Sequence, residues 1–194
     1  EIAVSHEALF IPAHAFTPHK SLFGVCTRRL SALLNEKECS HISAIELGLS
    51  ADTEMADQIK ELWEVEYLTN SDAHSPEKIG REYNLMELEN PSYEECALAF
   101  QRKNHRRVVE NYGMDPRLGK YHHNCCDACS LIFEGSALNG RCPDCGSSKV
   151  VKGVSERIAE IADLPAGNHP ESRPVYHYQT PLQMLPGLGG KTLD

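Results

Sequence analysis

The stretch VEYLTNSDAHS, from Val65 to Ser75, decides how the fold of this sequence is interpreted. Val65 to Leu68 forms a short run with strand propensity, which predicts a buried strand. A polar segment, Asn70 to His74, follows at once and contributes nothing to a hydrophobic core. In α/β folds, a buried strand that ends in such a polar segment is typical of an active site.

Two similar strand candidates precede this stretch. Leu9 to His14 is a strand-like run that stops at a histidine, and Ile42 to Leu47 carries Glu46 near its end. Helical patterns over residues 27–34 and 53–63 separate the three candidates. The resulting β-α-β-α-β order predicts an α/β fold with a mostly parallel sheet, either open or closed into a barrel.

Each of the three strand candidates ends in a side chain that can bind a metal ion. These side chains are His14, Glu46 and the pair Asp72 and His74. In a parallel α/β barrel the carboxyl ends of the strands meet on one face, and imidazole and carboxylate groups suit divalent metals. The competing interpretation is structural, because a polar residue at a strand end often only forms hydrogen bonds, and Ser71 and Ser75 can cap the next helix.

A second chemical pattern consists of two C-x2-C knuckles, separated by twelve residues. Four thiolates at this spacing predict a tetrahedral zinc site without an open position, which is a structural site. The four cysteines are Cys126, Cys129, Cys142 and Cys145. Alternative ligands are Cys125, His122 and His123.

The helix that is expected to begin near Asn90-Pro91 ends in a basic segment. Its cationic residues are Arg102, Lys103, Arg106 and Arg107. Cations at a helix C-terminus complement the helix dipole, which is the simpler interpretation. The alternative is a patch that contacts nucleic-acid phosphates beside the zinc site.

Composition limits the function classes. The 194-residue chain has a formal net charge of −9, which argues against a surface coated in positive charge for indiscriminate nucleic-acid binding. Five of the eight cysteines lie in one 21-residue window, which favours a single metal site over a secreted disulfide framework. No signal peptide is visible, and no apolar run reaches the roughly 18 residues of a membrane span. We therefore expect a cytoplasmic protein.

Several motifs, taken together and in this order, resemble the polymerase and histidinol phosphatase (PHP) superfamily, and most closely its endonuclease Q branch. The resemblance covers about residues 9–185. The motifs are Ile11–His14, Ala44–Asp52, Asn70–Pro76, Gly80–Glu82, Gly119–His122, the two cysteine knuckles and Arg173–Tyr176.

The resemblance implies a distorted seven-unit β/α barrel that holds a multi-metal site, followed by a zinc-binding module. Endonuclease Q nicks DNA on the 5′ side of deaminated bases, such as uracil and hypoxanthine, and of abasic sites. By resemblance, His14 matches a metal-binding histidine, and Asp72 and His74 match the closing Asp-x-His motif. Glu46 matches a recurring glutamate. The implied catalytic residues are Asp72, His74 and Glu46, and the implied catalytic metals are zinc, magnesium or manganese.

One departure from the family pattern is large. The family's first-strand Asp-x-His-x-His motif and its middle-strand ligands have no counterpart here, and the family continues beyond the last residue, Asp194. We therefore expect the C-terminal part of a PHP-type barrel over residues 1–112, and a small zinc-ribbon-like module with a short helix over 113–163. An irregular extension is expected over 164–194. A second chain or segment would supply the missing half of the barrel, and without it the metal site is expected to be incomplete.

The leading functional hypothesis is a metal-dependent DNA-repair endonuclease with DNA as its partner. One alternative is a PHP phosphoesterase that acts on a small phosphate ester. Another is a non-catalytic zinc-ribbon protein that binds nucleic acid. Salt-dependent DNA binding distinguishes the first hypothesis from the small-ester alternative, because phosphate contacts release counterions from DNA.

Overall fold

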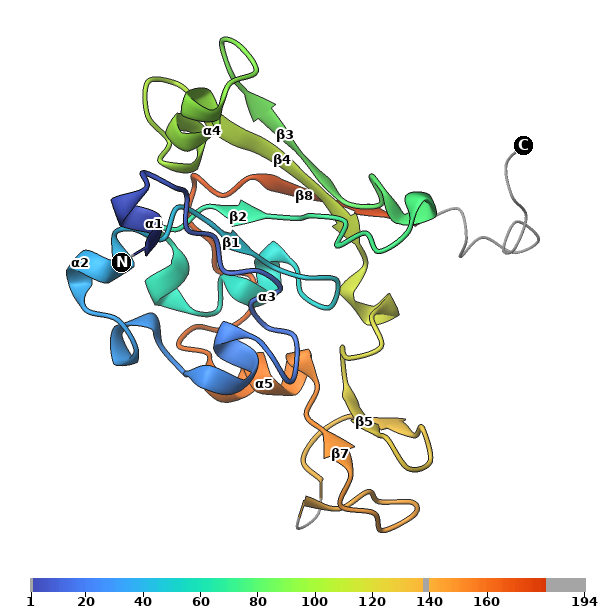
Figure 1. Ribbon diagram of the computed structural model, residues 1–194. Helices are drawn as coiled ribbons and strands as arrows, with labels where there is room; N and C mark the ends of the chain where they lie inside the picture. The colour runs from blue at the N-terminus through green and yellow to red at the C-terminus, as the bar shows by residue number, and fades with distance from the viewer. Residues whose placement is uncertain (1, 138–139, 181–194) are drawn as a thin grey trace.

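Three extended segments lie side by side at the centre of the computed structural model, which describes residues 2–137 and 140–180 (Figure 1). β1 (Ile45–Glu46) pairs in parallel with β2 (Tyr67–Leu68). Residues 10–15 run parallel to β1 on its other side, where Ser43 N donates to Phe10 O at 2.9 Å and Glu46 N donates to Pro12 O at 3.0 Å. The predicted parallel arrangement of the three segments is therefore confirmed, although each makes only a short run of strand pairing.

A second sheet has the strand order β3-β4-β8. Its strands are β3 (Tyr83–Glu87), β4 (Arg107–Met114) and β8 (Val175–Gln179). β8 pairs in parallel with β4. The rings of Tyr83, Tyr112 and His177 stack across the sheet with centroids 4.7 Å apart in each step. The segment 164–194, which was expected to be irregular, thus contributes a strand, while residues 181–194 lie outside the described part of the chain.

The helices are short. The α-helices are α1 (Ile2–Ser5), α2 (Glu36–Cys39), α3 (Thr53–Ala56), α4 (Tyr93–Phe100) and α5 (Val154–Ile161). Single turns of other types are Leu22–Cys26, Leu30–Ala32, Lys60–Leu62, Pro76–Lys78 and Pro116–Leu118. The helix expected over 53–63 is interrupted, because the carbonyl of Gln58 accepts hydrogen bonds from Asp163 N and Leu164 N and so cannot continue a helix.

The hydrophobic core lies between the parallel segments and α5. Val154, Ile158 and Ile161 of α5 are buried in the same cluster as the stacked pair Phe16 and Phe23. α5 therefore packs against the main body, although the sequence placed its short helix in the zinc-binding module. β4 likewise crosses the expected boundary at residue 113.

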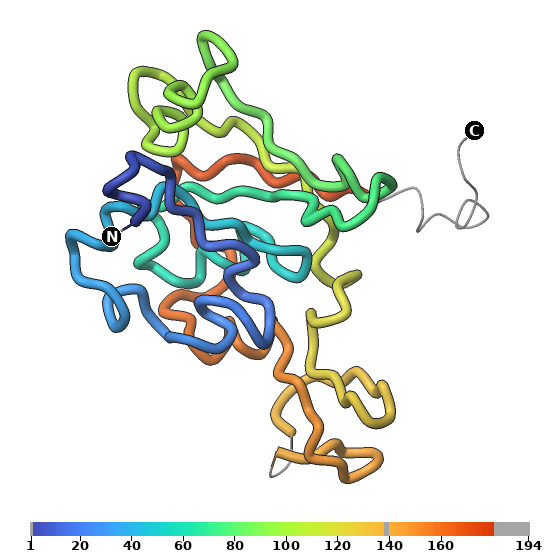
Figure 2. Tube along the Cα trace, viewed as in Figure 1, coloured from blue at the N-terminus to red at the C-terminus, as the bar shows by residue number. Residues whose placement is uncertain are grey.

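A small cysteine ribbon projects from the body (Figure 1). It consists of residues 124–151, of which 124–137 and 140–151 are described, and contains the antiparallel strands β5 (Asn124–Cys126), β6 (Ile132–Phe133) and β7 (Val150–Val151). Two connections join it to the body, one before β5 and one after β7 (Figure 2). The two connections fix the base of the ribbon at the body.

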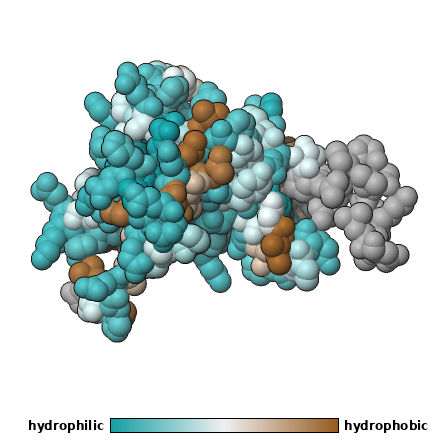
Figure 3. Space-filling view, turned by 90° about the horizontal axis from the view of Figure 1, so that it is seen from above, coloured by the Kyte–Doolittle hydropathy of each residue, from teal (hydrophilic) through white to brown (hydrophobic). Residues whose placement is uncertain are grey.

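The described residues form one two-stranded and two three-stranded sheets, so they make a mixed α/β fold without closing a barrel. Seen from above, the surface is mostly hydrophilic and its hydrophobic residues form small separate patches (Figure 3). Within residues 2–137 and 140–180, no helix is long and apolar enough to cross a membrane.

Candidate functional site

A cavity of about 340 Å³ lies beyond the ends of β1 and β2. His14 and Asp72, which come from different strand candidates, both line it. The complete lining is His14, Thr17, Gly48, Leu49, Ser50, Asp72, Arg81, Met114, Leu118, Gly119, Lys120 and Tyr121. The structure thus brings together two of the residues selected as metal ligands. We call this cavity the His14 pocket.

Both His14 and Asp72 have a left-handed backbone conformation, with φ of 35° and 44°. This conformation is uncommon for residues other than glycine, and it persists only where the surrounding structure imposes it. At His14 the backbone N–H donates to the buried carboxylate of Glu46, which helps to hold this conformation. The other oxygen of Glu46 accepts from Gly48 N at 2.7 Å.

Glu46 is therefore held as a bridge between two loops. Burial raises the pKa of Glu46, the charge of Asp72 adds to the rise, and the hydrogen bonds from His14 and Gly48 oppose it. Because both carboxylate oxygens accept backbone hydrogen bonds, the side chain positions His14 rather than pointing freely into the pocket. Gly48 has φ +78°, and a Cβ there would lie 3.1 Å from His14 Cβ, so the close approach requires glycine.

The residues around the pocket fit a divalent metal in part. His14 Nδ1 is buried and has no hydrogen-bond partner, so this nitrogen could serve as a metal ligand. The Asp72 side chain is 53% exposed and can reach an ion. His74 is 78% exposed, and its Nδ1 lies 2.9 Å from Asp72 O. These groups do not converge to ligand distance, since among the described residues only the cysteines form such a cluster.

Glu82, at the base of β3, is an additional buried acid near this site that the sequence analysis did not select. Its Oε1 accepts from Met114 N at 2.7 Å, and its Oε2 is buried without a partner. Burial raises the pKa of Glu82 to about 7, against the hydrogen bond from Met114 and with a contribution from the charge of Glu46. Its place within the Gly80–Glu82 motif was the only available signal.

This raised pKa predicts a pH dependence of stability. The folded protein keeps the Glu82 proton up to about pH 7, whereas the unfolded chain releases it near 4.5. Stability therefore falls as pH rises between these values, by about 3 kcal/mol at about 1.4 kcal/mol per pKa unit. In Glu82→Gln this contribution to the pH dependence should disappear.

Denaturant unfolding at about pH 5 and about pH 8 measures the effect. Glu87→Gln, on the exposed side of the same strand, is the matched control and should keep the wild-type pH dependence. A Glu82→Gln variant with the same pH dependence as the wild type would show that Glu82 is ionised in the folded protein.

The sulfur atoms of Cys126, Cys129, Cys142 and Cys145 all lie within 4.8 Å of one another. None of these cysteines forms a disulfide. Burial opposes ionisation of Cys126, but the backbone N–H groups of Cys129 and Ala128 and the neighbouring thiols lower its pKa to about 7. Four thiols this close together can bind a structural zinc ion, as the spacing predicted.

The alternative zinc ligands have other contacts. Cys125 lies outside the cluster and pairs with Ile132 and Val151 in the ribbon sheet. His122 Nδ1 lies 3.4 Å from Ser50 O, and His123 Nδ1 lies 3.1 Å from Glu156 Oε1. The geometry therefore selects Cys126 over Cys125, because successive strand residues point to opposite faces.

We expect each chain to retain one zinc ion through a chelator wash. Cys142→Ser should lose it, since the remaining three thiolates leave an open position to solvent and competing chelator. Cys125→Ala is the matched control and should retain zinc. Elemental analysis of the washed proteins is the measurement, and full retention in Cys142→Ser would contradict the assignment.

The basic segment does not lie on a helix, contrary to the sequence prediction. α4 ends at Phe100. Arg102, Asn104 and His105 then have positive φ before β4 begins at Arg107. Arg102 Nε donates to the buried carboxylate of Glu66 at 2.9 Å, and Arg106 Nε donates to Glu95 at 2.8 Å.

These ion pairs neutralise two of the four cations that were selected as nucleic-acid contacts. The Arg102 and Arg106 side chains are mostly buried, whereas Arg107 is exposed in a surface pair with Glu87, and Lys103 is exposed. The geometry assigns Arg102 and Arg106 to holding the segment in place. Contact of this segment with DNA stays a prediction, and Lys103 and Arg107 are its accessible members.

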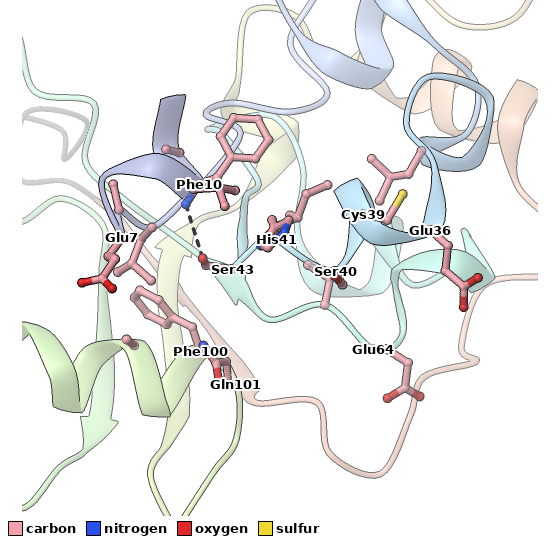
Figure 4. Close-up of a pocket in the computed structure, with 18 of the residues that line it drawn as sticks. Glu7, Phe10, Glu36, Cys39, Ser40, His41, Ser43, Glu64, Phe100 and Gln101 are labelled. Carbon is pink, nitrogen blue, oxygen red and sulfur yellow. Dashed lines mark hydrogen bonds between the residues drawn. The ribbon is translucent and has the colours of Figure 1, made fainter. Parts of the chain in front are cut away.

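A larger cavity of about 850 Å³ lies between α1, α2 and α4 (Figure 4). Its lining includes the rings of Phe10 and Phe100 and the carboxylates of Glu7, Glu36 and Glu64. None of the selected catalytic residues lies there. The acidic side chains would repel a phosphate group, so the smaller His14 pocket is the better candidate for phosphate chemistry.

The amino-acid sequence of this chain is similar to those of two known proteins. No protein-family model matches the chain. It is 47% identical over 188 residues to the uncharacterized protein YqxK of Bacillus subtilis, a match that covers 96% of this chain and 46% of YqxK. It is 42% identical over 154 residues to the uncharacterized protein MJ0043 of Methanocaldococcus jannaschii, covering 74% of this chain and 19% of MJ0043.

Two solved structures are similar to the chain over 94% of its length at 38% identity. One is the lesion-specific endonuclease PfuEndoQ from Pyrococcus furiosus, with a TM-score of 0.80 and 45% of that chain covered. The other is endonuclease Q in complex with a 27-mer duplex that has an abasic lesion at the active site, with a TM-score of 0.83 and 46% covered. The chain thus spans about half the length of endonuclease Q and of YqxK, and shares the fold of that half.

Proposed function

We propose that this chain is part of a metal-dependent DNA-repair endonuclease that nicks DNA on the 5′ side of deaminated bases or abasic sites. The observation that carries the proposal is the similarity to endonuclease Q, which has been solved with an abasic duplex at its active site. The meeting of His14 and Asp72 in one pocket supports it, because these are the residues that the family resemblance selects.

Each site residue has a distinct part in this proposal. His14 and Asp72 would hold divalent metal, His14 through its unpartnered Nδ1. Such metals supply an activated water and neutralise charge on the scissile phosphate. Glu46 is a positioning residue, since it fixes the backbone of His14. His74, exposed next to Asp72, would add a further ligand from the same loop.

The metal site needs ligands that these residues do not provide. The chain spans about half the length of YqxK and of endonuclease Q, and only the cysteines cluster at ligand distance in the described part. We therefore propose that a further segment or a second chain supplies the remaining ligands. The cysteine ribbon, with its structural zinc, and the exposed Lys103 and Arg107 would help to hold DNA.

The rival function is hydrolysis of a small phosphate ester. The net charge of −9 and the paired arginines Arg102 and Arg106 favour it, because a small substrate needs no extended basic surface. A non-catalytic nucleic-acid-binding ribbon is the third possibility, and it needs none of the residues of the His14 pocket.

Salt-dependent binding and metal-dependent hydrolysis together separate these functions. The intact protein, meaning this chain together with the segment or second chain that completes the metal site, is titrated with duplex DNA over a range of salt. It is also incubated with p-nitrophenyl phosphate and divalent metal. The proposal expects DNA affinity that falls steeply with salt, together with strand cleavage and little hydrolysis of the ester. Rapid ester hydrolysis without DNA binding would establish a small-molecule phosphoesterase. DNA binding without any metal-dependent cleavage would establish a non-catalytic nucleic-acid-binding protein.

A further inference from the structure

Two motifs without an assigned role, Gly80–Glu82 and Gly119–His122, meet in space at the His14 pocket. Arg81 from the first motif and Lys120 from the second both line the pocket. The first lies between β2 and β3, and the second lies between β4 and the cysteine ribbon. Two cations from distant parts of an acidic chain thus flank the candidate catalytic residues.

Arg81 is unusual among the arginines. Among the described residues, every arginine except Arg81 and Arg141 forms an ion pair with a carboxylate. Arg81 instead donates from Nε to the carbonyl of Ser71 at 2.7 Å. Ser71 precedes Asp72, so this bond fixes the guanidinium beside the pocket and leaves its two terminal nitrogens without a described partner.

Lys120 is presented by a segment that is held firmly to the body. A Cβ at Gly119 would lie 2.3 Å from Ser50 Oγ and 3.1 Å from Leu49 O, so the segment passes close to the loop after β1. Tyr121 O accepts a hydrogen bond from Val154 N at 2.8 Å. Lys120 itself is exposed, with Nζ 4.9 Å from the centroid of the Tyr121 ring, and forms no ion pair with a described carboxylate.

The chemistry of these two side chains suits a phosphodiester. A guanidinium offers a planar fork of donors that matches two phosphate oxygens, and an ammonium is a compact positive charge. Groups that are fixed before the substrate binds lose little entropy when they contact it. The Arg81 guanidinium is fixed through Ser71, whereas for Lys120 the backbone is held through Gly119 and the side chain stays exposed.

We propose that Arg81 and Lys120 form a clamp that binds the backbone phosphates on either side of the scissile bond in the nicked strand. The clamp rests on the proposed function, since it assigns the DNA contacts of the same site. It moves the main phosphate contacts away from the basic segment after α4, where Arg102 and Arg106 are already paired.

The first test compares Arg81→Gln and Lys120→Gln in the intact protein. Each change should weaken DNA binding by about tenfold, the effect of losing one charged hydrogen bond. Each should also lower the slope of log affinity against log salt by about 0.9 on duplex DNA. The rate at saturating DNA should change much less than the affinity. Lys37→Gln, an exposed lysine on α2 away from the pocket, is the matched control and should match the wild type.

The second test uses DNA in which single phosphates are replaced by neutral methylphosphonates. The wild type should lose affinity at the two positions that flank the scissile bond. Arg81→Gln should lose no further affinity at one of them, and Lys120→Gln should lose none at the other, because the contact is already absent. Arg81→Lys should recover part of the affinity, since it restores the charge without the fork.

The outcomes separate the clamp from the proposed function. If the wild type nicks DNA but both glutamine variants keep its salt slope, the clamp is wrong and the endonuclease proposal stands. A fall in rate alone for Arg81→Gln, with an unchanged slope, would mean that Arg81 only supports the Asp72 loop, and would also overturn the clamp. A wild type that neither binds nor nicks DNA would overturn both proposals.

Discussion

Asp72→Asn in the intact protein should reduce strand cleavage by about a thousandfold or more while largely preserving DNA binding. The change removes a negative charge that binds metal and scarcely alters the shape of the side chain. A loss of this size corresponds to about 4 kcal/mol of transition-state stabilisation, in line with the several kcal/mol that a metal contributes. Substitutions at His14 and His74 should behave in the same way.

Single-turnover cleavage and a binding titration on the same duplex make the comparison. Asp144→Asn, an exposed aspartate in the cysteine ribbon, provides the same chemical change away from the pocket and should cleave normally. Near-normal cleavage by Asp72→Asn would remove Asp72 from the catalytic site.

Arg173→Ala should lower the free energy of unfolding by about 3–5 kcal/mol, because it leaves a buried carboxylate without its partner. Arg173 and Asp57 form an ion pair at 2.7 Å, with side chains only 3% and 0% exposed. Arg173 also donates to the carbonyls of Val65 and Leu62, and its guanidinium lies 3.5 Å from the centroid of the Tyr67 ring. This one side chain therefore joins the segment before β8 to β2 and its neighbours.

Denaturant unfolding measures this loss, and Arg107→Ala is its matched control. Arg107 pairs with Glu87 on the surface, where both side chains are more than half exposed. An exposed pair of this kind contributes at most about 1 kcal/mol, so the two arginine variants should differ clearly. Equal stabilities for the two variants would show that the Arg173–Asp57 pair is not buried in solution.

The sequence was most informative where the signal is local. The C-x2-C spacing predicted the four cysteines of the cluster, with Cys125 left as an alternative to Cys126, since knuckle geometry depends on neighbouring residues. The direction of the parallel segments followed from the alternation of strand and helix patterns. His14 and Asp72 share a pocket because the ends of parallel strands meet at one edge.

Features that depend on distant contacts could not be predicted. The segment after α4 has a helical charge pattern, but Arg102 leaves the helix to pair with Glu66, thirty-six residues earlier in the chain. Glu82 and Arg81 likewise gain their significance only when β3 and its preceding loop fold against the pocket. The sequence did not predict β8, because the strand that it pairs with, β4, lies more than sixty residues earlier in the chain.

Cleavage of a duplex with one lesion tests the central claim most directly. The intact protein is incubated with divalent metal and end-labelled duplexes that contain one deoxyuridine, one hypoxanthine, one abasic site or no lesion. We expect a single metal-dependent nick on the 5′ side of a lesion, and an intact lesion-free duplex. Equal cleavage of all four duplexes, or no cleavage of any, would contradict it.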